Sequence, residues 1–443
     1  MSCLRFGLLK VPKREGCTTL RKNRVFAEAV GGPNFVVEDV TVEVETRQKR
    51  KETVSDEVLV IRVRPKAAHA GRCSLCRVVC PGYDAGGGTR RWRTLDVGTT
   101  KAYLEAAAPR VSCPEHGVVV AHVPWARPGA KCTWLFEDTC AWLAATMASS
   151  SLAVFMRVAW RTVADIVVRV VADGRATNDM LAGLKRIGID EISYRKGHRY
   201  LTIVIDHDTG RLVWAAQGRD KETLAGFFTE LGAERCAELT HVSADGAEWI
   251  HTVVREKAKN AVICLDAFHA VMWAMKALDK VRTRTLAASG TRDRNLMWAV
   301  RKNPVDLTGE QKESLASIVA TNKTLYRAYL LKEQLREVFR VKGDQGRKLL
   351  AGWLWWASHS RIKEFVDLAR SIRHYRDLIL NTLDHGLSNG RTEATNTHLR
   401  ALTKRAYGFH SPEALIGMAL LTRGGLRPEL PGRAARNHPL QRQ

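Results

Sequence analysis

The sequence lacks any apolar run approaching the roughly 20 residues that a membrane-spanning helix needs. Its first residues, MSCLRFGLLKVPKREGC, also lack the apolar core of a secretory signal peptide. These two absences argue against a membrane protein and against a secreted one. We therefore expect a soluble cytoplasmic protein that has no membrane partner.

Acidic residues are scarce relative to basic ones. The 443-residue chain has 46 Asp and Glu against 70 Lys and Arg, which leaves a net charge of +24 at pH 7. A balance this basic favours a polyanion over a neutral metabolite as partner, and nucleic acid is the first candidate. With 45% hydrophobic residues, the chain can bury sizeable cores, and its length predicts about two to four domains.

The ten cysteines are scattered, apart from a cluster of Cys73, Cys76 and Cys80. Without a secretory signal, this cluster indicates a metal site before a disulfide. The pair Cys73-x-x-Cys76 is followed by a second pair, Cys113-x-x-His116, and the sequence between them is typical of β-hairpins. This pattern predicts a zinc ribbon with one tetrahedral zinc, whose binding supplies folding energy. Cys80 is a rival ligand, which we rank below His116 because Cys73 and Cys76 already form a complete pair.

Residues 132–174 have a helical pattern and contain two short helices that meet shortly before Trp160. Ser151 is placed to cap the first helix, and Trp160 would open the second. This layout fits a helix-turn-helix, whose second helix presents its N-terminal residues to the major groove of DNA. Arg161 and Thr162 would then lie close to DNA. An ordinary helical hairpin is the alternative interpretation.

Strand signals begin at Arg186, where RIGIDEIS, RYLTIVIDHDTG and RLVWAAQG predict an antiparallel meander. Helical and strand segments then alternate through LTHVSADG and AVICLDAFH. The resulting order, β-β-β-α-β-α-β-α, is that of the ribonuclease H fold. Its first and fourth strands lie side by side, so Asp190 in one strand and Asp245 at the end of the other should converge.

After Val281 the chain becomes helical and basic, which predicts a helical insertion in the ribonuclease H-like core. The insertion contains the aromatic cluster Trp353, Trp355 and Trp356. We expect these side chains to pack in a core rather than to stack on bases.

Glu393 is a lone acid in the basic segment SNGRTEATNTHLRALTKRAYGF. One interpretation is an ion pair on a solvated helix, worth a few tenths of a kcal/mol. In the other interpretation Glu393 is a metal ligand. Arg400 and Lys404, seven and eleven positions later, fall near the same helical face, where they would hold DNA phosphates while the acid reaches the metal.

Three carboxylates suit Mg²⁺ or Mn²⁺, and two such ions roughly 3.5 to 4 Å apart stabilise both the attacking and the leaving oxygen of an in-line phosphoryl transfer. In this arrangement Asp190 would bridge the two metals, Asp245 would hold one, and Glu393 the other. Water or a DNA 3′-hydroxyl would be the nucleophile.

Asp266, in CLDAFH, is the rival of Glu393 for the role of third acid. It ends the strand that follows Asp245, whereas Glu393 is separated from that strand by the whole insertion. We expect Asp266 instead to cap the helix that starts near Phe268 or to orient His269.

The blocks GIDEISYRKGHRYLTIVID, GRDKETLAGFF, VSADG, CLDAFHAV and SNGRTEATNTHLRALTKRAYGF, taken in order, resemble the DDE transposases of the ISL-three family of bacterial insertion sequences. The resemblance covers most of the chain, including the zinc ribbon, the helix-turn-helix and the insertion. It implies a DDE triad of Asp190, Asp245 and Glu393, and a protein that binds terminal inverted repeats and cuts or joins element ends. Ala394 and His116 depart from the Gly and Cys expected in this family.

We therefore predict a multidomain α/β protein that works on DNA at the bacterial nucleoid, as a homo-oligomer in a synaptic complex. A catalytically inactive DNA-binding repressor and a structure-selective nuclease with the same core are the alternatives. The predicted segments are an N-terminal β-rich part (1–70), the zinc ribbon (71–128), the helix-turn-helix (129–178), the first part of the catalytic core (179–281), the helical insertion (282–385), the final core helix (386–424) and a basic tail (425–443).

Overall fold

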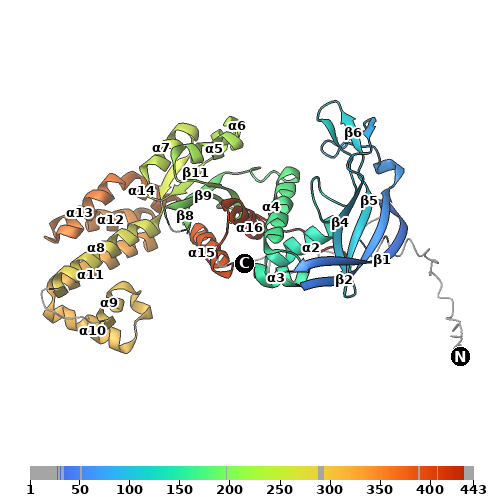
Figure 1. Ribbon diagram of the computed structural model, residues 1–443. Coiled ribbons are helices and arrows are strands. Elements are labelled where there is room, and N and C mark those ends of the chain that lie inside the picture. Colours follow the sequence, from blue (N-terminus) through green and yellow to red (C-terminus); the bar gives the residue numbers. More distant parts are fainter. Residues whose placement is uncertain are drawn as a thin grey trace, which may run out of the picture. The chain divides into compact units, whose positions relative to one another are not determined.

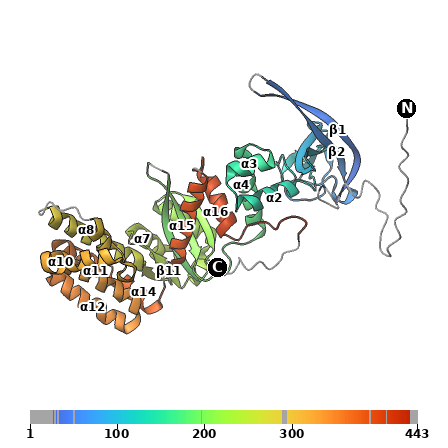
Figure 2. The ribbon, with the colours of Figure 1, turned by 90° about the horizontal axis from the view of Figure 1, so that it is seen from below.

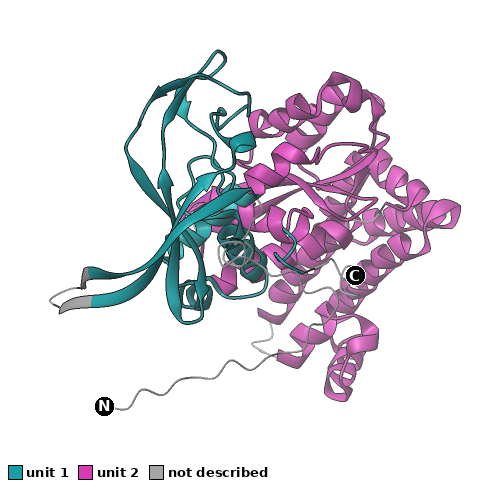
Figure 3. Ribbon diagram, turned by 90° about the vertical axis from the view of Figure 1, so that its right-hand side faces the viewer, with its two compact units in different colours: residues 1–170, 428–443 teal, residues 171–427 magenta. Residues whose placement is uncertain are grey.

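The computed structural model describes residues 34–49, 52–195, 197–287, 294–387, 390–406 and 408–433, together with Ala27 and Val30. The chain forms two compact units, one of residues 1–170 and 428–443 and the other of residues 171–427 (Figure 3). The N-terminal stretch that we searched for a signal peptide, two residues of the charged segment TRQKRKE and the last ten residues of the basic tail lie outside the described residues. No described helix has the length and apolar character needed to cross a membrane.

A four-stranded sheet opens the first unit, in the order β1 (Phe35–Lys49), β2 (Glu52–Pro65), β5 (Thr100–Ala107) and β4 (Thr89–Val97). Strands β2 and β5 run parallel, and the other pairs are antiparallel. Both β1 and β2 fall within residues 1–70, the part that was predicted to be β-rich. Trp92 and Trp125 meet edge to face in the core of this sheet, with ring centroids 5.5 Å apart.

The predicted zinc ribbon is a separate antiparallel sheet of three short strands, in the order β3 (Gly82–Asp84), β6 (Arg110–Cys113) and β7 (Gly117–Val120). A single 3-10 turn, η1 (Ala67–His69), precedes it. The core of this sheet is small and consists largely of cysteine and short aliphatic side chains. A sheet of this size has too little apolar surface to fold alone, which is the circumstance in which a structural metal is needed.

Three helices follow the ribbon, α2 (Trp134–Ala144), α3 (Ser149–Met156) and α4 (Trp160–Thr177). The start of α4 at Trp160 confirms the prediction, but our placement of Ser151 as a cap was wrong. Ala148 is the N-cap of α3, and no side chain caps this end. Arg157 has the left-handed conformation, with φ 55°, that ends α3 and lets the chain turn into α4.

The second unit contains a five-stranded mixed sheet, in the order β10 (Leu212–Gln217), β9 (Arg199–Asp206), β8 (Arg186–Arg195), β11 (His241–Ala244) and β12 (Val262–Leu265). The first three strands pair antiparallel, and β11 runs parallel to both β8 and β12. This order and these directions confirm the predicted ribonuclease H-like core.

Helices cover both faces of this sheet (Figures 1 and 2). On one face, buried side chains of α5 (Lys221–Leu231) and α7 (Glu248–Lys257) pack with Ile187 and Ile189 of β8. The short α6 (Ala233–Glu238) links α5 to β11. The opposite face carries the C-terminal helices α15 (Gly390–Arg405) and α16 (Pro412–Arg423).

The helical insertion consists of α8 (Ala267–Ala287), α9 (Arg294–Arg301), η2 (Pro304–Asp306), α10 (Gly309–Thr321), α11 (Lys323–Val341), α12 (Gly343–His359), α13 (Lys363–His374) and α14 (Arg376–His385). Helix α8 continues through position 281, where we placed the boundary of the insertion. The last helix is tied back to the sheet, because the Asn381 amide donates to the Ile263 carbonyl (2.9 Å) and the Thr382 hydroxyl to that of Leu265 (2.7 Å).

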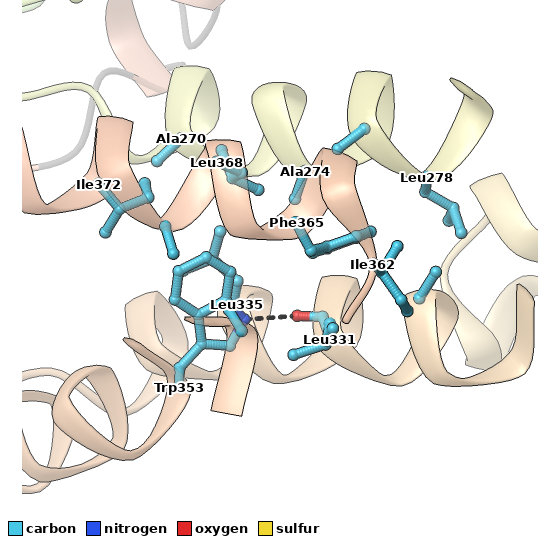
Figure 4. Packing of buried hydrophobic residues seen from close by; sticks show 14 of the residues in the cluster. Ala270, Ala274, Leu278, Leu331, Leu335, Trp353, Ile362, Phe365, Leu368 and Ile372 are labelled. Carbon is cyan, nitrogen blue, oxygen red and sulfur yellow. Dashed lines mark hydrogen bonds between the residues drawn. The ribbon is translucent and has the colours of Figure 1, made fainter. Parts of the chain in front are cut away.

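Trp353 lies at the centre of the insertion core, fully buried, and its indole N–H donates to the Leu331 carbonyl at 2.7 Å (Figure 4). Trp356 packs against the same cluster. The expected core packing is therefore confirmed for these two residues and wrong for Trp355, which is 66% exposed and stacks on His359.

Candidate active site and DNA interface

Four zinc-type ligands converge at the tip of the ribbon. The atoms Cys73 Sγ, Cys76 Sγ, Cys113 Sγ and His116 Nδ1 lie within 4.8 Å of one another. Cys76 Sγ and Cys113 Sγ are 3.6 Å apart, and His116 Nδ1 lies 3.6 Å from Cys113 Sγ. Ligands 2.3 Å from a tetrahedral zinc would be about 3.8 Å apart, so these spacings fit one zinc. Cys80 is buried beside the cluster and its thiol donates to the Val78 carbonyl.

The hydrogen bonding around these cysteines is also that of a metal-binding turn. The Leu75 N–H points at Cys73 Sγ, 3.4 Å away. A hydrogen bond with His116 lowers the pKa of the Cys113 thiol to about 6, which outweighs the opposing effect of burial. Donors directed at sulfur stabilise the thiolate, the form that binds metal.

Helix α4 presents the residues predicted to face DNA. Arg161 is exposed in its first turn, with the guanidinium 5.3 Å from the centroid of the Trp160 ring, and Thr162 is partly exposed beside it. The helix is anchored from behind by Glu137 of α2, a fully buried acid that accepts from Arg127 (3.2 Å) and from Arg169 of α4 (2.8 Å). Because its orientation is fixed in this way, α4 offers a preformed surface.

In the second unit, the pairing of β8 with β11 brings Asp190 and Asp245 near each other. Ser243 of β11 lies opposite Gly188 of β8 in a parallel ladder. Asp190 follows Gly188 by two residues on β8, and Asp245 follows directly after the end of β11, close enough for its charge to act on Asp190. Asp245 is held there by the Ala247 N–H, which donates to its Oδ1 at 2.9 Å.

The Asp190 side chain is partly buried, and its carboxylate accepts two short hydrogen bonds. The Glu191 N–H donates to Oδ1 and the Asn396 amide donates to Oδ2, both at 2.7 Å. Burial raises the pKa of Asp190 to about 6, and the negative charge of Asp245 adds to this effect, while the two hydrogen bonds and the charge of His269 oppose it. Burial disfavours the charged form of a carboxylate, and a bound cation removes this penalty, so such a group has a strong affinity for a cation.

Contacts between α15 and β8 bring Glu393 back to the sheet. A Cβ atom on Gly188 would lie only 2.7 Å from Thr392 Oγ1 and 2.9 Å from His207 Nε2, so the close approach of the helix requires glycine there. Arg391 also donates to backbone carbonyls of the β9–β10 turn, including that of Asp208 at 2.7 Å. Asn396, one turn after Glu393, is 2% exposed and makes the bond to Asp190.

Glu393 itself is only partly buried, with 44% of its side chain exposed, and Arg400 Nη1 lies 3.4 Å from its Oε1. The ion pair that the first interpretation predicted is therefore present. Lys404 is exposed two turns beyond Asn396, on the same helix. Arg400 and Lys404 both remain at the surface, where a phosphate can reach them.

The three predicted acids are less tightly gathered than the zinc ligands. Among the described residues, only the four ribbon side chains form a set of ligand atoms within 4.8 Å of one another. Ligands of two different ions roughly 4 Å apart stand further from each other than ligands of a single ion.

Sequence reasoning missed Glu191. Its side chain is 6% exposed and paired with Arg219, and its buried Oε1 has no hydrogen-bond partner among the described residues. Burial raises its pKa to about 7, and the charge of Asp245 contributes, against the opposing effect of Arg219. The sequence signal for Glu191 was that it directly follows Asp190 in an otherwise apolar strand. Neighbouring residues on a strand point to opposite faces, and only Asp190 was assigned to the site.

Asp266 makes both contacts that we expected of it. Its Oδ1 accepts from the Phe268 N–H at 3.0 Å, at the start of α8, and its Oδ2 lies 2.8 Å from His269 Nδ1. Burial disfavours a charged His269, but the bond to Asp266 and the charges of Asp266, Asp245 and Asp190 outweigh burial and raise its pKa. His269 can therefore carry a positive charge beside the acidic cluster, and sequence reasoning did not assign it to that cluster.

Three models of protein families match this chain. Residues 187–419 match the sequence model of a transposase family, residues 69–116 that of the zinc-finger of transposase IS204/IS1001/IS1096/IS1165, and residues 121–171 that of the helix-turn-helix domain of transposase family ISL3.

Relatives are found along most of the chain. The transposase for insertion sequence element IS1557 of Mycobacterium tuberculosis is 48% identical over 449 residues, covering 95% of this chain and 99% of the relative, in strains CDC 1551 and H37Rv alike. The transposase for insertion sequence element IS1001 of Bordetella parapertussis is 24% identical over 335 residues, covering 73% of this chain and 82% of the relative. The chain therefore belongs to the ISL3 family of insertion-sequence transposases.

Proposed function

We propose that this transposase binds the terminal inverted repeats of an insertion sequence and catalyses divalent-metal-dependent strand cleavage and strand transfer. The observation that carries the proposal is the convergence of β8, β11 and α15. In support of the proposal, the charge of Asp245 acts on Asp190, and Glu393 precedes by one helical turn the Asn396 whose amide binds Asp190.

Asp190, Asp245 and Glu393 are the proposed ligands of two Mg²⁺ or Mn²⁺ ions. Carboxylate oxygens are the donors these ions prefer. The raised pKa of Asp190 and the unpartnered buried oxygen of Glu191 support the fit, because they mark negative charge that local cations leave uncompensated. When bound, the ions would stabilise the attacking and leaving oxygens of the phosphodiester.

The chain's own residues would position the reactants. Asn396 would fix the orientation of the Asp190 carboxylate through its amide, one helical turn from the partly exposed Glu393. Arg400 and Lys404 would hold phosphates of the DNA being cut, with Arg400 released from Glu393 when the acid turns to the metal. A water molecule would attack in cleavage and a DNA 3′-hydroxyl in joining.

The proposed role of the first unit is to recognise the element ends. Cys73, Cys76, Cys113 and His116 would hold one structural zinc, as their spacing supports. Arg161 and Thr162 would enter the major groove. The protein would act at the bacterial nucleoid, and a homo-oligomer would hold the two ends of one element together in a synaptic complex.

The test is incubation of the purified protein with duplexes carrying the element end, in Mn²⁺, with nicked and joined products scored on a denaturing gel. The proposal expects both products, and expects neither when Mn²⁺ is replaced by Ca²⁺. End binding without nicking would indicate a repressor. Nicking without joining, on ends and on branched DNA alike, would indicate a nuclease.

A further inference from the structure

A basic cavity lies beside the zinc ribbon in the first unit, and its lining includes no residue of α4. It has a volume of about 470 Å³, and its lining includes His69, Arg72, Arg77, His122 and Trp134. These residues come from the turn before the first ligand pair, from the residue after Cys76, from the segment after β7 and from the start of α2. None of the residues lining the cavity is acidic.

Arg72 is held in place without being neutralised. Its Nε donates to the Ala68 carbonyl (2.9 Å) and its Nη1 to the Arg77 carbonyl (3.0 Å). In the part of the chain that the structure describes, neither bond goes to a carboxylate. A guanidinium has five N–H donors, so these bonds leave three for a ligand while keeping the group rigid. A preorganised fork of this kind suits the paired oxygens of a phosphate.

His122 completes a donor set on the opposite side. Its Nδ1 contacts the Arg77 guanidinium, which can only donate, so Nδ1 accepts and the ring carries its proton on Nε2. Burial lowers the pKa of His122 to about 4, and the charges of Arg77, His69 and Arg72 contribute. The neutral ring therefore offers one N–H donor in a cavity of strongly positive potential.

We propose that this cavity binds one backbone phosphate of the DNA duplex held by the first unit, through Arg72 and the Nε2–H of His122. The inference rests on the proposed DNA-binding function and adds a second contact region to α4. DNA is favoured over a free anion because the cavity lies where the zinc ribbon meets the first helix of the helix-turn-helix domain. A backbone phosphate would fix the position of the protein on the duplex without reading its sequence.

The experiment uses the full-length protein and end duplexes in which single phosphates are replaced, one at a time, by neutral methylphosphonates. For the wild type, one substitution or two adjacent ones should weaken binding by about tenfold, the scale of a charge-assisted phosphate contact. In Arg72→Gln the same substitutions should have no further effect. The slope of log affinity against log salt should also fall by about 1 on end and random DNA alike.

Two controls separate loss of the phosphate contact from a general loss of positive charge and from loss of zinc. Arg90→Gln removes an exposed cation of β4 that has no bonding partner among the described residues and does not line the cavity, so it should leave the phosphate profile unchanged. Arg72 adjoins Cys73, so zinc content is measured for each variant, and His122→Ala, six residues beyond His116, provides the same comparison if Arg72→Gln loses zinc.

The outcomes separate this inference from the proposed function. If Arg72→Gln and His122→Ala leave every methylphosphonate penalty unchanged, the cavity inference is overturned while end recognition stands. A wild type that does not distinguish end from random DNA contradicts the proposed function, and the phosphate coupling can still be read on either duplex. Competition by inorganic phosphate without any coupled position on the DNA would assign the cavity to a free anion and overturn the inference.

Discussion

The side-chain amide of Asn396 donates a 2.7 Å hydrogen bond to the Asp190 carboxylate, and this contact joins residues that are 206 positions apart. Asn396 is buried, whereas Glu393, one turn earlier on the same helix, is partly exposed. The bond thus anchors α15 to β8 at the point where the helix delivers its acid. It links the helix that follows the insertion to the strand on which the site is built.

Replacing Asn396 by Ala should lower the rate of strand cleavage by about 10- to 100-fold, the usual effect of removing a group that orients a metal ligand. End binding should be unchanged, because Arg161 and Thr162, the residues predicted to face DNA, lie in the first unit, whereas Asn396 lies in the second. Cleavage is measured on end duplexes in Mn²⁺. Thr397→Ala, at an exposed position of the same helix, is the matched control, and equal losses in the two variants would contradict the positioning role.

Gly188→Ala should separate α15 from β8. The added methyl group would lie 2.7 Å from Thr392 Oγ1, and overpacking of this kind costs about 1 to 3 kcal/mol. Cleavage should fall sharply while zinc content and end binding are retained. The double variant Gly188→Ala/Thr392→Ala should recover part of the activity, because the hydroxyl it removes has no hydrogen-bond partner among the described residues.

Gly226→Ala is the control for Gly188→Ala. It adds the same methyl group to α5, where nothing lies within 4 Å. A Gly188→Ala protein with wild-type cleavage would show that the contact between Gly188 and Thr392 does not set the position of Glu393.

The raised pKa of Asp190 predicts a pH-dependent stability. Because the folded protein holds this proton more tightly than the unfolded chain, it loses stability as the pH rises from about 4 to about 6. Without added Mg²⁺ or Mn²⁺, Asp190→Asn should therefore have a higher Tm than the wild type at pH 7.5. Its free energy of unfolding should be larger by at most roughly 3 kcal/mol. The difference should vanish near pH 4.

Adding Mn²⁺ at pH 7.5 should raise the Tm of the wild type and not that of Asp190→Asn, because only the carboxylate binds the ion. Asp306→Asn, at an exposed acid in the insertion, is the control and should follow the wild type throughout. Parallel melting curves for Asp190→Asn and the wild type at every pH would contradict the account of Asp190.

Zinc content tests the ligand set of the ribbon, in which Cys80 is the rival of His116: zinc lost from Cys80→Ser but kept in His116→Ala would give Cys80 the place of His116. The purified wild type should contain one zinc per chain by elemental analysis. Cys76→Ser should lose it, because Cys76 Sγ lies 3.6 Å from Cys113 Sγ within the four-atom set. Cys80→Ser should keep it, because the Cys80 thiol instead donates to the Val78 carbonyl. Zinc retained in full by Cys76→Ser would contradict the predicted site.

Sequence patterns predicted the parts of this protein that depend on local spacing. Alternation of apolar residues predicted the strands β8 to β12, and their order was enough to place Asp190 beside Asp245. The two Cys/His pairs predicted the ribbon because zinc ligands occur at short, regular intervals. Ser151 was misplaced as a cap because α3 begins two residues earlier, at Ser149, with Ala148 as its N-cap.

The remaining features depend on tertiary contacts that no local pattern records. Strand alternation assigns Glu191 to the face opposite Asp190. Its carboxylate nevertheless belongs to the acidic cluster, because the charges of Asp245 and Asp190 act on it, and it pairs with Arg219 from the loop before α5. The packing of Thr392 on Gly188 and the bond from Asn396 form only when the insertion returns the chain to the sheet. Trp355 resembles its neighbours in sequence, but its position on α12 leaves it exposed.

The identity of the third acid is the central claim, and paired variants of Glu393 and Asp266 test it most directly. Cleavage, joining and end binding are measured for Glu393→Gln and Asp266→Asn on end duplexes in Mn²⁺. We predict that Glu393→Gln abolishes nicking and joining while end binding is kept, because a neutral amide cannot replace a carboxylate at a divalent metal. Asp266→Asn, which loses a cap worth about 1 kcal/mol, should still cleave. Near wild-type cleavage by Glu393→Gln, together with an inactive Asp266→Asn that still binds ends, would contradict the assignment.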